Sequence, residues 1–214
     1  MKQGKHLCWI IGVVVGVLGA GSGNAYATGT PAIGYSTYLG GSGTFDGYSL
    51  GWDFTLNTNV YITGLGYYDN SSDGNAFSHE VGIFSLSNSN LLVSATVAAG
   101  TGESLQGDGL HSSYRYHATS HLLLAGTYRI AAVGRPFPDV VGSVPSGLYT
   151  APEVSLGNSY YIFTGGTAVT FPTTLADGPS NPYLSPNFTF TVVPEPATVA
   201  FLAVGGLMLL WRRR

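Results

Sequence analysis

The feature that most constrains the fold of this chain is an alternation of apolar and polar residues that recurs along residues 28–193. Its clearest examples are Leu91–Val97, Tyr128–Ala132 and Phe188–Val192, where every second residue is apolar. Because successive side chains of a β-strand point to opposite faces, this period of two predicts strands that are buried on one face. No stretch of the region carries a helical apolar stripe for more than two turns. The region can therefore bury its apolar residues only by pairing strands into sheets.

Turn signals separate further segments of the same kind. Additional strands are predicted at Tyr35–Leu39, Tyr48–Thr55, Val60–Tyr68, Val81–Leu86, Ser113–His117 and Tyr160–Thr164. Clusters rich in Asn, Gly, Asp and Pro, such as residues 57–59 and 176–179, lie between strands and favour turns. About nine or ten short strands at this spacing predict one all-β domain at 28–193, an antiparallel β-sandwich of jelly-roll type. Residues 134–157 contain four prolines and are predicted to form a long surface loop.

Residues 1–27 are typical of a secretory signal peptide. Its three parts are a positive n-region with Lys2 and Lys5, an apolar helix at Leu7–Gly19, and an A-x-A cleavage site formed by Ala25 and Ala27. Cleavage after Ala27 would remove Cys8, which is the one cysteine of the chain. The exported body is then expected to contain no disulfide and no metal bound by cysteine.

Residues 194–214 form a separate tail. Its parts are the motif Pro194, Glu195 and Pro196, the uncharged segment Ala197–Trp211, and the cluster Arg212, Arg213 and Arg214. The prolines prevent a helix from extending upstream into the body. As a helix, the fifteen uncharged residues would be about 22 Å long, which is barely enough to cross a hydrocarbon core of about 30 Å. The arginines favour a cytoplasmic C-terminus with the body outside. The tail is therefore predicted to hold a single transmembrane helix, and a plain membrane anchor is the simplest interpretation of that helix.

The Pro-Glu-Pro motif, the short apolar helix and the terminal arginines together closely resemble the PEP-CTERM sorting tail of Gram-negative bacteria that secrete exopolysaccharide. A plain anchor would explain the helix and the arginines but not the motif. The resemblance implies export, recognition by an exosortase, and cleavage near Pro194–Pro196. It also implies that the protein is held in the membrane only until it is cleaved, and then reaches the cell surface or the extracellular matrix.

The body also resembles the β-sandwich domain that many PEP-CTERM proteins share, over most of residues 45–193. The segments that carry this resemblance are Leu65–Gly74, Ser78–Phe84, Leu91–Val97 and Leu124–Ile130. Such domains look like structural or adhesive modules, and the resemblance brings no catalytic residue with it. We therefore expect a non-catalytic protein of the surface or of an exopolysaccharide biofilm matrix, with the exosortase and the secretion machinery as its partners.

The charge of the body excludes one class of partner. Residues 28–193 contain three arginines, no lysine and ten carboxylates, which gives a net charge of −7. Binding to nucleic acid requires a basic footprint, so nucleic acid is not an expected partner. An acidic surface without lysine suits solubility outside the cell and association with divalent cations.

One segment has the spacing of a calcium loop. Oxygen ligands and a glycine occupy its positions 1, 3, 5, 6 and 12, which are Asp69, Ser71, Asp73, Gly74 and Glu80. The flanking segments are predicted strands, so the loop cannot belong to an EF-hand. In the alternative interpretation it is a hairpin loop in which Asp69 and Asp73 bind backbone N–H groups. Ca²⁺ is the one cofactor that the sequence suggests.

Enzymatic signals are weaker. Residues 47–51 match the G-x-S-x-G motif of hydrolases, but that motif needs a following helix, and Trp52–Leu56 continues as an alternating strand. Three histidines could be imagined as metal ligands, but they lie in predicted strand and turn and are expected to be exposed or hydrogen bonded: His111, His117 and His121. His79, beside Glu80, is expected to be a structural hydrogen-bonding residue at the start of a strand. A hydrolase is thus the least favoured function.

Aromatic residues indicate an alternative function. Sugars stack on aromatic rings beside polar side chains, and the body holds Trp52 and many tyrosines, including Tyr67, Tyr68, Tyr149, Tyr160, Tyr161 and Tyr183. The pairs Tyr67-Tyr68 and Tyr160-Tyr161 should each place one ring on either face of a strand, which predicts some exposure. Tyrosine is also an ordinary strand and core residue. A carbohydrate-binding module that acts on secreted polysaccharide is therefore the alternative to a purely structural role.

Overall fold

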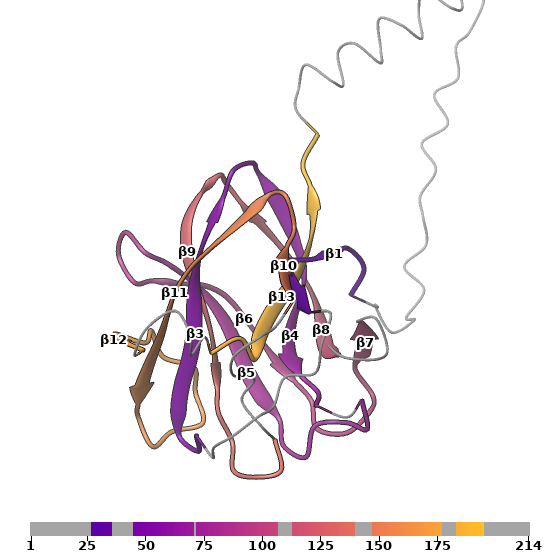
Figure 1. The fold of residues 1–214 in the computed structure, drawn as a ribbon, viewed down its shortest axis with the longest axis vertical. Coiled ribbons are helices and arrows are strands. Elements are labelled where there is room, and N and C mark those ends of the chain that lie inside the picture. Colours follow the sequence, from indigo (N-terminus) through magenta and orange to yellow (C-terminus); the bar gives the residue numbers. More distant parts are fainter. Residues whose placement is uncertain are drawn as a thin grey trace, which may run out of the picture.

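The computed structural model describes residues 27–35, 45–70, 72–106, 113–139, 147–176 and 183–194. Their regular structure consists of β-strands, and all strand pairs are antiparallel, as Figure 1 shows. The predicted all-β class is confirmed. The described part of the chain contains no helix with the length and apolar character needed to cross a bilayer. The predicted signal segment up to residue 26 and the tail from residue 195 lie outside the described residues.

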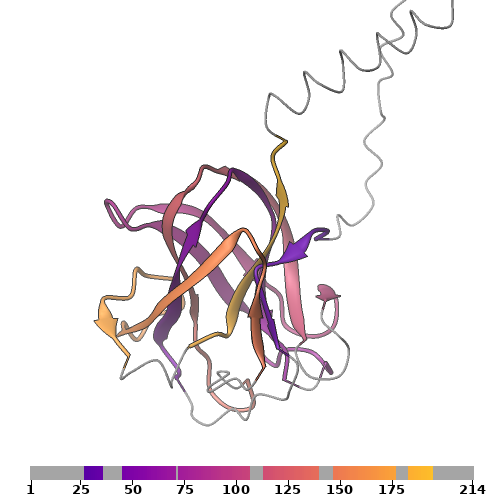
Figure 2. The same cartoon turned by 45° about the horizontal axis from the view of Figure 1, so that its top comes forward.

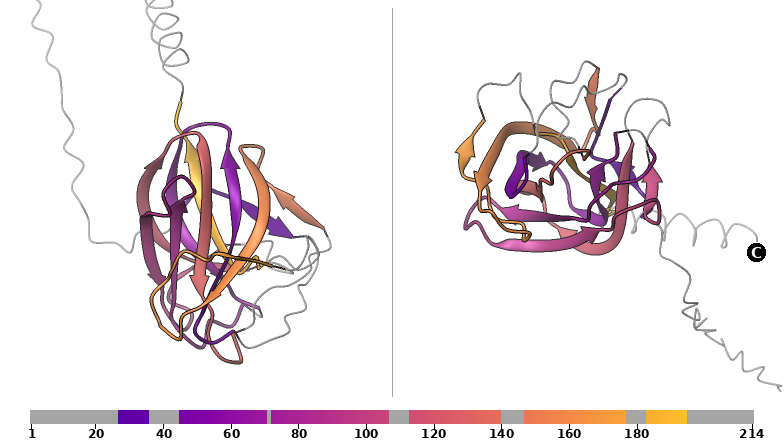
Figure 3. Two further views of the ribbon diagram at one scale, coloured as in Figure 1. Left: turned by 90° about the vertical axis from the view of Figure 1, so that its left-hand side faces the viewer. Right: turned by 90° about the horizontal axis from the view of Figure 1, so that it is seen from below.

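Two large sheets face each other and curl into a half-barrel (Figures 2 and 3). The first has the order β12-β11-β3-β9-β5-β6 and consists of β3 (Tyr48–Leu56), β5 (His79–Ser85), β6 (Leu91–Val97), β9 (Gly126–Val133), β11 (Val154–Phe163) and β12 (Thr174–Leu175). The second has the order β1-β13-β4-β8-β7 and consists of β1 (Thr30–Pro31), β4 (Val60–Tyr68), β7 (Ser104–Gln106), β8 (Tyr114–Leu123) and β13 (Pro186–Val192). A separate ribbon pairs β2 (Ile33–Tyr35) with β10 (Leu148–Thr150).

Aromatic side chains hold the two large sheets together. Trp52 and Phe54 point inward from β3 and pack on Phe188 from β13, with ring centroids 6.1 Å and 4.7 Å away. The Trp52 indole N–H donates to the carbonyl oxygen of Pro186 at 2.8 Å. All three rings are buried, as the alternating pattern of these strands requires. This core fixes the relative position of β3 and β13.

A strap formed by residues 164–176 covers the outer face of the first sheet. The backbone N–H of Val169 donates to the Glu80 carboxylate at 2.8 Å, and that of Thr170 donates to the Ser49 hydroxyl at 2.9 Å. Arg129 lies under the strap, where it pairs with Asp53 at 2.5 Å. The outward-facing polar side chains of Ser49, Glu80 and Arg129 are therefore covered by the strap and hydrogen bonded.

The two ends of the half-barrel differ. At one end, the tail end, Val192 of β13 pairs with Val60, and β1 runs beside β13 through the pair of Thr30 and Phe190. The other end, the loop end, is where β4 and β9 finish and β5 begins. Strands β3 and β4 have nine residues each, so at about 3.4 Å per residue the two ends are about 27 Å apart. In Figure 1 the tail end is at the top and the loop end at the bottom.

The strand predictions were accurate where alternation was clean. Val60–Tyr68 and Leu91–Val97 are confirmed to the residue as β4 and β6. The predicted loop at 134–157 is wrong in its second half, because that half contains β10 and the start of β11. There, Val154 and Leu156 face inward and pair with β3, while β10 pairs with β2.

Candidate functional site

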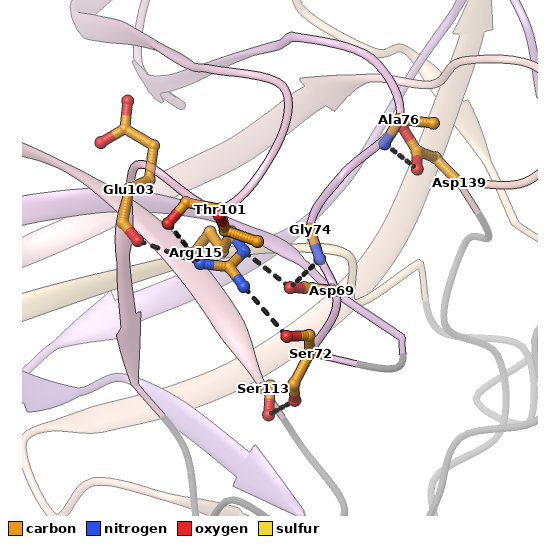
Figure 4. A network of polar contacts seen from close by, with 9 residues as sticks. All are labelled: Asp69, Ser72, Gly74, Ala76, Thr101, Glu103, Ser113, Arg115 and Asp139. Atoms are coloured by element: carbon orange, nitrogen blue, oxygen red, sulfur yellow. Dashed lines mark hydrogen bonds and ion pairs between the residues drawn. The ribbon is translucent and has the colours of Figure 1, made fainter.

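The segment between β4 and β5 at the loop end is fixed at its start by a buried ion pair. Asp69 is 2% exposed, and its Oδ2 accepts hydrogen bonds from Arg115 Nε at 2.7 Å and from the backbone N–H of Gly74 at 3.1 Å. Arg115 comes from β8, the strand that pairs with β4 (Figure 4). The carboxylate thus closes a tight loop on its own backbone and is neutralised from the neighbouring strand.

Arg115 uses its remaining donors on backbone carbonyls. One terminal nitrogen donates to Thr101 at 3.1 Å and Glu103 at 3.2 Å, and the other donates to Ser72 at 3.0 Å. A buried guanidinium is tolerated when its donors and its charge are satisfied in this way. One arginine therefore ties the β4–β5 segment to the chain before β7.

A second carboxylate holds the other half of the segment. Asp139 accepts hydrogen bonds from the backbone N–H groups of Ala76 and Phe77, each at 2.8 Å, and its Oδ2 lies 2.9 Å from His79 Nε2. Partial burial acts to raise the pKa of Asp139, but the hydrogen bonds from His79, Ala76 and Phe77 outweigh it and hold this pKa below its ordinary value.

His79 is buried, and its Nδ1 donates to the carbonyl oxygen of Val133 at 2.9 Å. Its ring also stacks on Tyr67, with centroids 3.5 Å apart. The predicted structural role of His79 at the start of β5 is confirmed. The histidine, Asp139 and the end of β9 together brace the loop end.

A pocket of about 410 Å³ opens between these two anchors. Its lining residues are Tyr68, Asp69, Asn70, Asp73, Gly74, Asn75, Ala76, Phe137, Pro138 and Asp139. Phe137 on its wall is 74% exposed, which is unusual for a phenylalanine. We call this feature the loop-end pocket. It places an apolar ring opposite amide and carboxylate side chains.

Asn75 is the most unusual residue of the pocket. It is 3% exposed, and its side-chain nitrogen has no hydrogen-bond partner in the described structure. Leaving a buried polar group without a partner costs about 1–3 kcal/mol. Sequence reasoning missed Asn75, Phe137 and Asp139 as a group, because the chain brings 137–139 to 75–79 only through the pairing of β5 with β9.

The predicted calcium ligands do not form one cluster. Asp69 is occupied by Arg115, Asp73 is exposed at the loop-end pocket, and Glu80 accepts from Val169 beneath the strap. Alternation along β5 turns His79 inward and Glu80 outward, which explains the separation. Ser71 lies outside the described residues. Within the described ranges no group of three or more His, Cys, Asp or Glu side chains is placed to hold a metal. The calcium site stays a prediction.

The residues that gave enzymatic signals lie on β3 and β8 where the structure describes them. Ser49 of the G-x-S-x-G motif is buried within β3, which confirms the strand interpretation of residues 48–56. His117 is exposed on β8 and lies 2.9 Å from the Glu103 carboxylate. His121 is on the same strand, and His111 lies outside the described residues.

The predicted exposure of the Tyr67-Tyr68 pair is wrong, since both rings are buried. A register shift in β4 turns Tyr67 toward the core beneath His79, and Tyr68 packs against Tyr114 of β8. Trp52 is also buried. Tyr160 is covered by Arg129, whose guanidinium carbon is 3.4 Å from the ring centroid. Tyr149, by contrast, is exposed.

Other aromatic residues gather at the loop end. This aromatic cluster consists of Phe45, Tyr48, Tyr161, Phe163 and Tyr183, whose neighbouring rings contact one another. Phe163 is 63% exposed and lies 4.9 Å from Tyr48, centroid to centroid. The sequence predicted Tyr161 and Tyr183 as candidates but missed the phenylalanines, because the rings come from separate segments.

The processing residues lie mostly beyond the described part. Pro194 is the last described residue and is exposed, while Ala25, Glu195, Pro196 and Arg212–Arg214 lie outside. Ala27 is buried, and its carbonyl oxygen accepts from the Gln106 side chain. Cleavage after Ala27 would therefore remove this buried residue and its hydrogen bond from the body.

No protein-family model matches the chain, and no curated protein matches it either.

Proposed function

We propose that this protein is exported, sorted by an exosortase, and serves as a non-catalytic component of the cell surface or of an exopolysaccharide biofilm matrix. The observation that carries the proposal is the sequence that follows β13, namely the Pro-Glu-Pro motif, the uncharged segment and the terminal arginines. Strands β1 and β13 are neighbours, and β13 ends at the tail end, from which the predicted sorting tail continues. A membrane-attached precursor would thus present its loop end outward.

The use of charged side chains supports a structural role. Each arginine of the body donates to protein acceptors: Arg115 to Asp69, Arg129 to Asp53, and Arg135 to the carbonyl of Ser78. Arginines that are used in this way leave no basic surface for phosphates, so nucleic acid is not a proposed partner. The proposed partners are the exosortase, the secretion machinery and, transiently, the membrane.

The proposal includes the finer architecture. The half-barrel would be a β-sandwich of jelly-roll type, with a signal helix within residues 1–27 and one transmembrane helix within residues 194–214. The prolines at 194 and 196 and the uncharged segment after them support the second helix.

The test is to determine both termini of the native protein by mass spectrometry, in the extracellular matrix and in the membrane. We expect a matrix form that starts at Thr28 and ends near Pro194. If all of the protein is in membranes and retains Arg214, the tail is an anchor and exosortase sorting is wrong.

Binding to secreted polysaccharide is the second candidate function. Two exposed phenylalanines at the loop end, Phe137 and Phe163, favour it, because exposed aromatic rings provide stacking surfaces for sugars. The purified protein should co-sediment with the native exopolysaccharide and be released by an excess of soluble fragments. A protein that stays in the supernatant at all polysaccharide concentrations would remove this candidate.

A further inference from the structure

We propose that the loop-end pocket binds one neutral sugar residue, which stacks on Phe137 and accepts a hydrogen bond from the side chain of Asn75. This inference deepens the second candidate function and rests on it for the class of ligand. It adds a location, a set of contacts and a preference for uncharged sugars.

The size and the wall of the pocket suit such a ligand. A volume of about 410 Å³ lies within the range of small-molecule sites, which is about 300–1,000 Å³. Phe137 presents an apolar ring at 74% exposure beside polar lining residues. The C–H face of a sugar ring could cover this phenylalanine while its hydroxyl groups reach the polar side.

Asn75 supplies the observation that points to a ligand. Its side-chain nitrogen is buried without a partner, although three backbone groups around it are hydrogen bonded. Gly74 N–H donates to Asp69, the Asn75 carbonyl accepts from Gly100 N–H at 2.7 Å, and Ala76 N–H donates to Asp139. The nitrogen is covered in this structure, so a rotation of the Asn75 side chain toward the pocket must accompany binding, and a sugar oxygen would then provide the missing acceptor.

The charges of the lining favour a neutral sugar over an anionic one. The pocket is lined by the carboxylates of Asp69, Asp73 and Asp139, and the described residues of its lining include no lysine or arginine. Asp69 and Asp139 are bonded to Arg115 and His79, whereas Asp73 is exposed and can accept from sugar hydroxyls. A uronic acid or a phosphate would meet like charge here.

The test measures binding of methyl glycosides of glucose, galactose and mannose to the full chain, purified in a zwitterionic detergent without sugar headgroups. Ligand-observed NMR detects binding, and calorimetry gives the affinity. Methyl glucuronide, inorganic phosphate and CaCl₂ are measured in parallel. We expect at least one neutral glycoside to bind, and the three charged probes not to compete with it.

Two variants and two matched controls locate the site. Asn75→Asp replaces the donor with an acceptor of the same shape, and Phe137→Ala removes the exposed ring; each should weaken binding by roughly tenfold or more. Asn158→Asp on β11 and Tyr61→Ala near the tail end, both at exposed side chains, should leave the affinity unchanged, and Phe163→Ala tests the aromatic cluster. Near-ultraviolet circular dichroism checks that Asn75→Asp is folded, and Phe137→Ala removes a side chain that is mostly in water.

Three results would overturn the proposal. The first is that no neutral glycoside binds, and the second is that a charged probe binds in preference to all of them. The third is that Phe163→Ala abolishes glycoside binding while both pocket variants retain it, which would move the sugar site to the aromatic cluster. Co-sedimentation with whole polysaccharide is scored separately, so that this third result refutes the pocket and leaves polysaccharide binding intact.

Discussion

Two carboxylates, Asp69 and Asp139, organise the loop end, and each combines backbone N–H donors with one partner side chain. The sequence around Asp69 indicates a functional loop, whereas the sequence around Asp139 does not. Asp69 belongs to a recognisable acidic loop, whereas Asp139 follows two prolines in what the sequence presents as an unstructured loop. The residues that shape the loop-end pocket are therefore fixed by electrostatics as much as by apolar packing.

Replacing Arg115 by methionine should destabilise the body strongly. The substitution leaves the Asp69 carboxylate buried without its partner, and breaking such a buried pair costs about 3–5 kcal/mol. Urea denaturation of the wild type and the variant measures this difference. The double variant Asp69→Asn with Arg115→Met removes both charges and should recover part of the loss; if it is no more stable than Arg115→Met alone, the unpaired charge is not the cause.

Acid should weaken the bracing of the loop end through Asp139. Its pKa in the folded protein lies below the ordinary value of 3.8, so the unfolded chain takes up the proton first as the pH falls. The stability from this group is present above that value and is lost as the pH falls through the lower, folded pKa. Thermal melting between pH 7 and pH 2 should show a shallower acid decline for Asp139→Asn than for the wild type. An unchanged decline would contradict this linkage, and the exposed Asp73→Asn serves as control.

At the scale of elements, the sequence predicts β4 and β6 to the residue, predicts only part of the longer strands β8 and β11, and predicts the shortest strands poorly. β4 and β6 carry seven to nine residues of alternation, enough to define a period, whereas β1, β7, β10 and β12 have two or three residues and no period to detect. The same limit applies to the site. Its acidic loop is visible because it is local, but Phe137 and Asp139 reach it through the pairing of β5 with β9, which no local pattern encodes.

Strand β3 contains a glycine whose role is a close approach of backbones. A Cβ at Gly51 would lie 1.8 Å from the carbonyl oxygen of Ile130 in β9 and 2.7 Å from the Cα of Ala131. Gly51→Ala should therefore push β3 and β9 apart and cost about 3 kcal/mol, measured by thermal and urea unfolding. Gly102→Ala is the control, since nothing lies within 4 Å of its added Cβ. Equal stability of the two variants would refute the close approach as the reason for glycine in this motif.

At the scale of the whole molecule, the two ends of the half-barrel have different surroundings in the proposed precursor. The predicted transmembrane segment begins a few residues after β13, so the tail end would lie next to the bilayer, and the loop end would be about 27 Å further out. The loop-end pocket and the aromatic cluster both lie at the outer end in this arrangement.

Cysteine labelling can test that orientation, because the body contains no native cysteine. In vesicles that carry residues 28–214, Thr167→Cys near the loop end should react with a bulky maleimide polymer several times faster than Thr191→Cys at the tail end. Both positions are exposed, so the difference would report the nearby membrane. Detergent should make the two rates equal. Equal rates in vesicles as well would mean that the tail end does not face the membrane.

The pairing of β1 with β13 sets an order for folding. β13 lies between β1 and β4, and it is the last strand to be synthesised, while β1 is the first. Until Phe188 and Phe190 emerge, the second sheet lacks the strand that joins β1 to β4, and the core lacks two of its rings. The second sheet can therefore be completed only after the last strand of the body has been synthesised. If the protein is exported as proposed, as an extended chain, this late completion of the sheet would keep the precursor competent for transport until the final step.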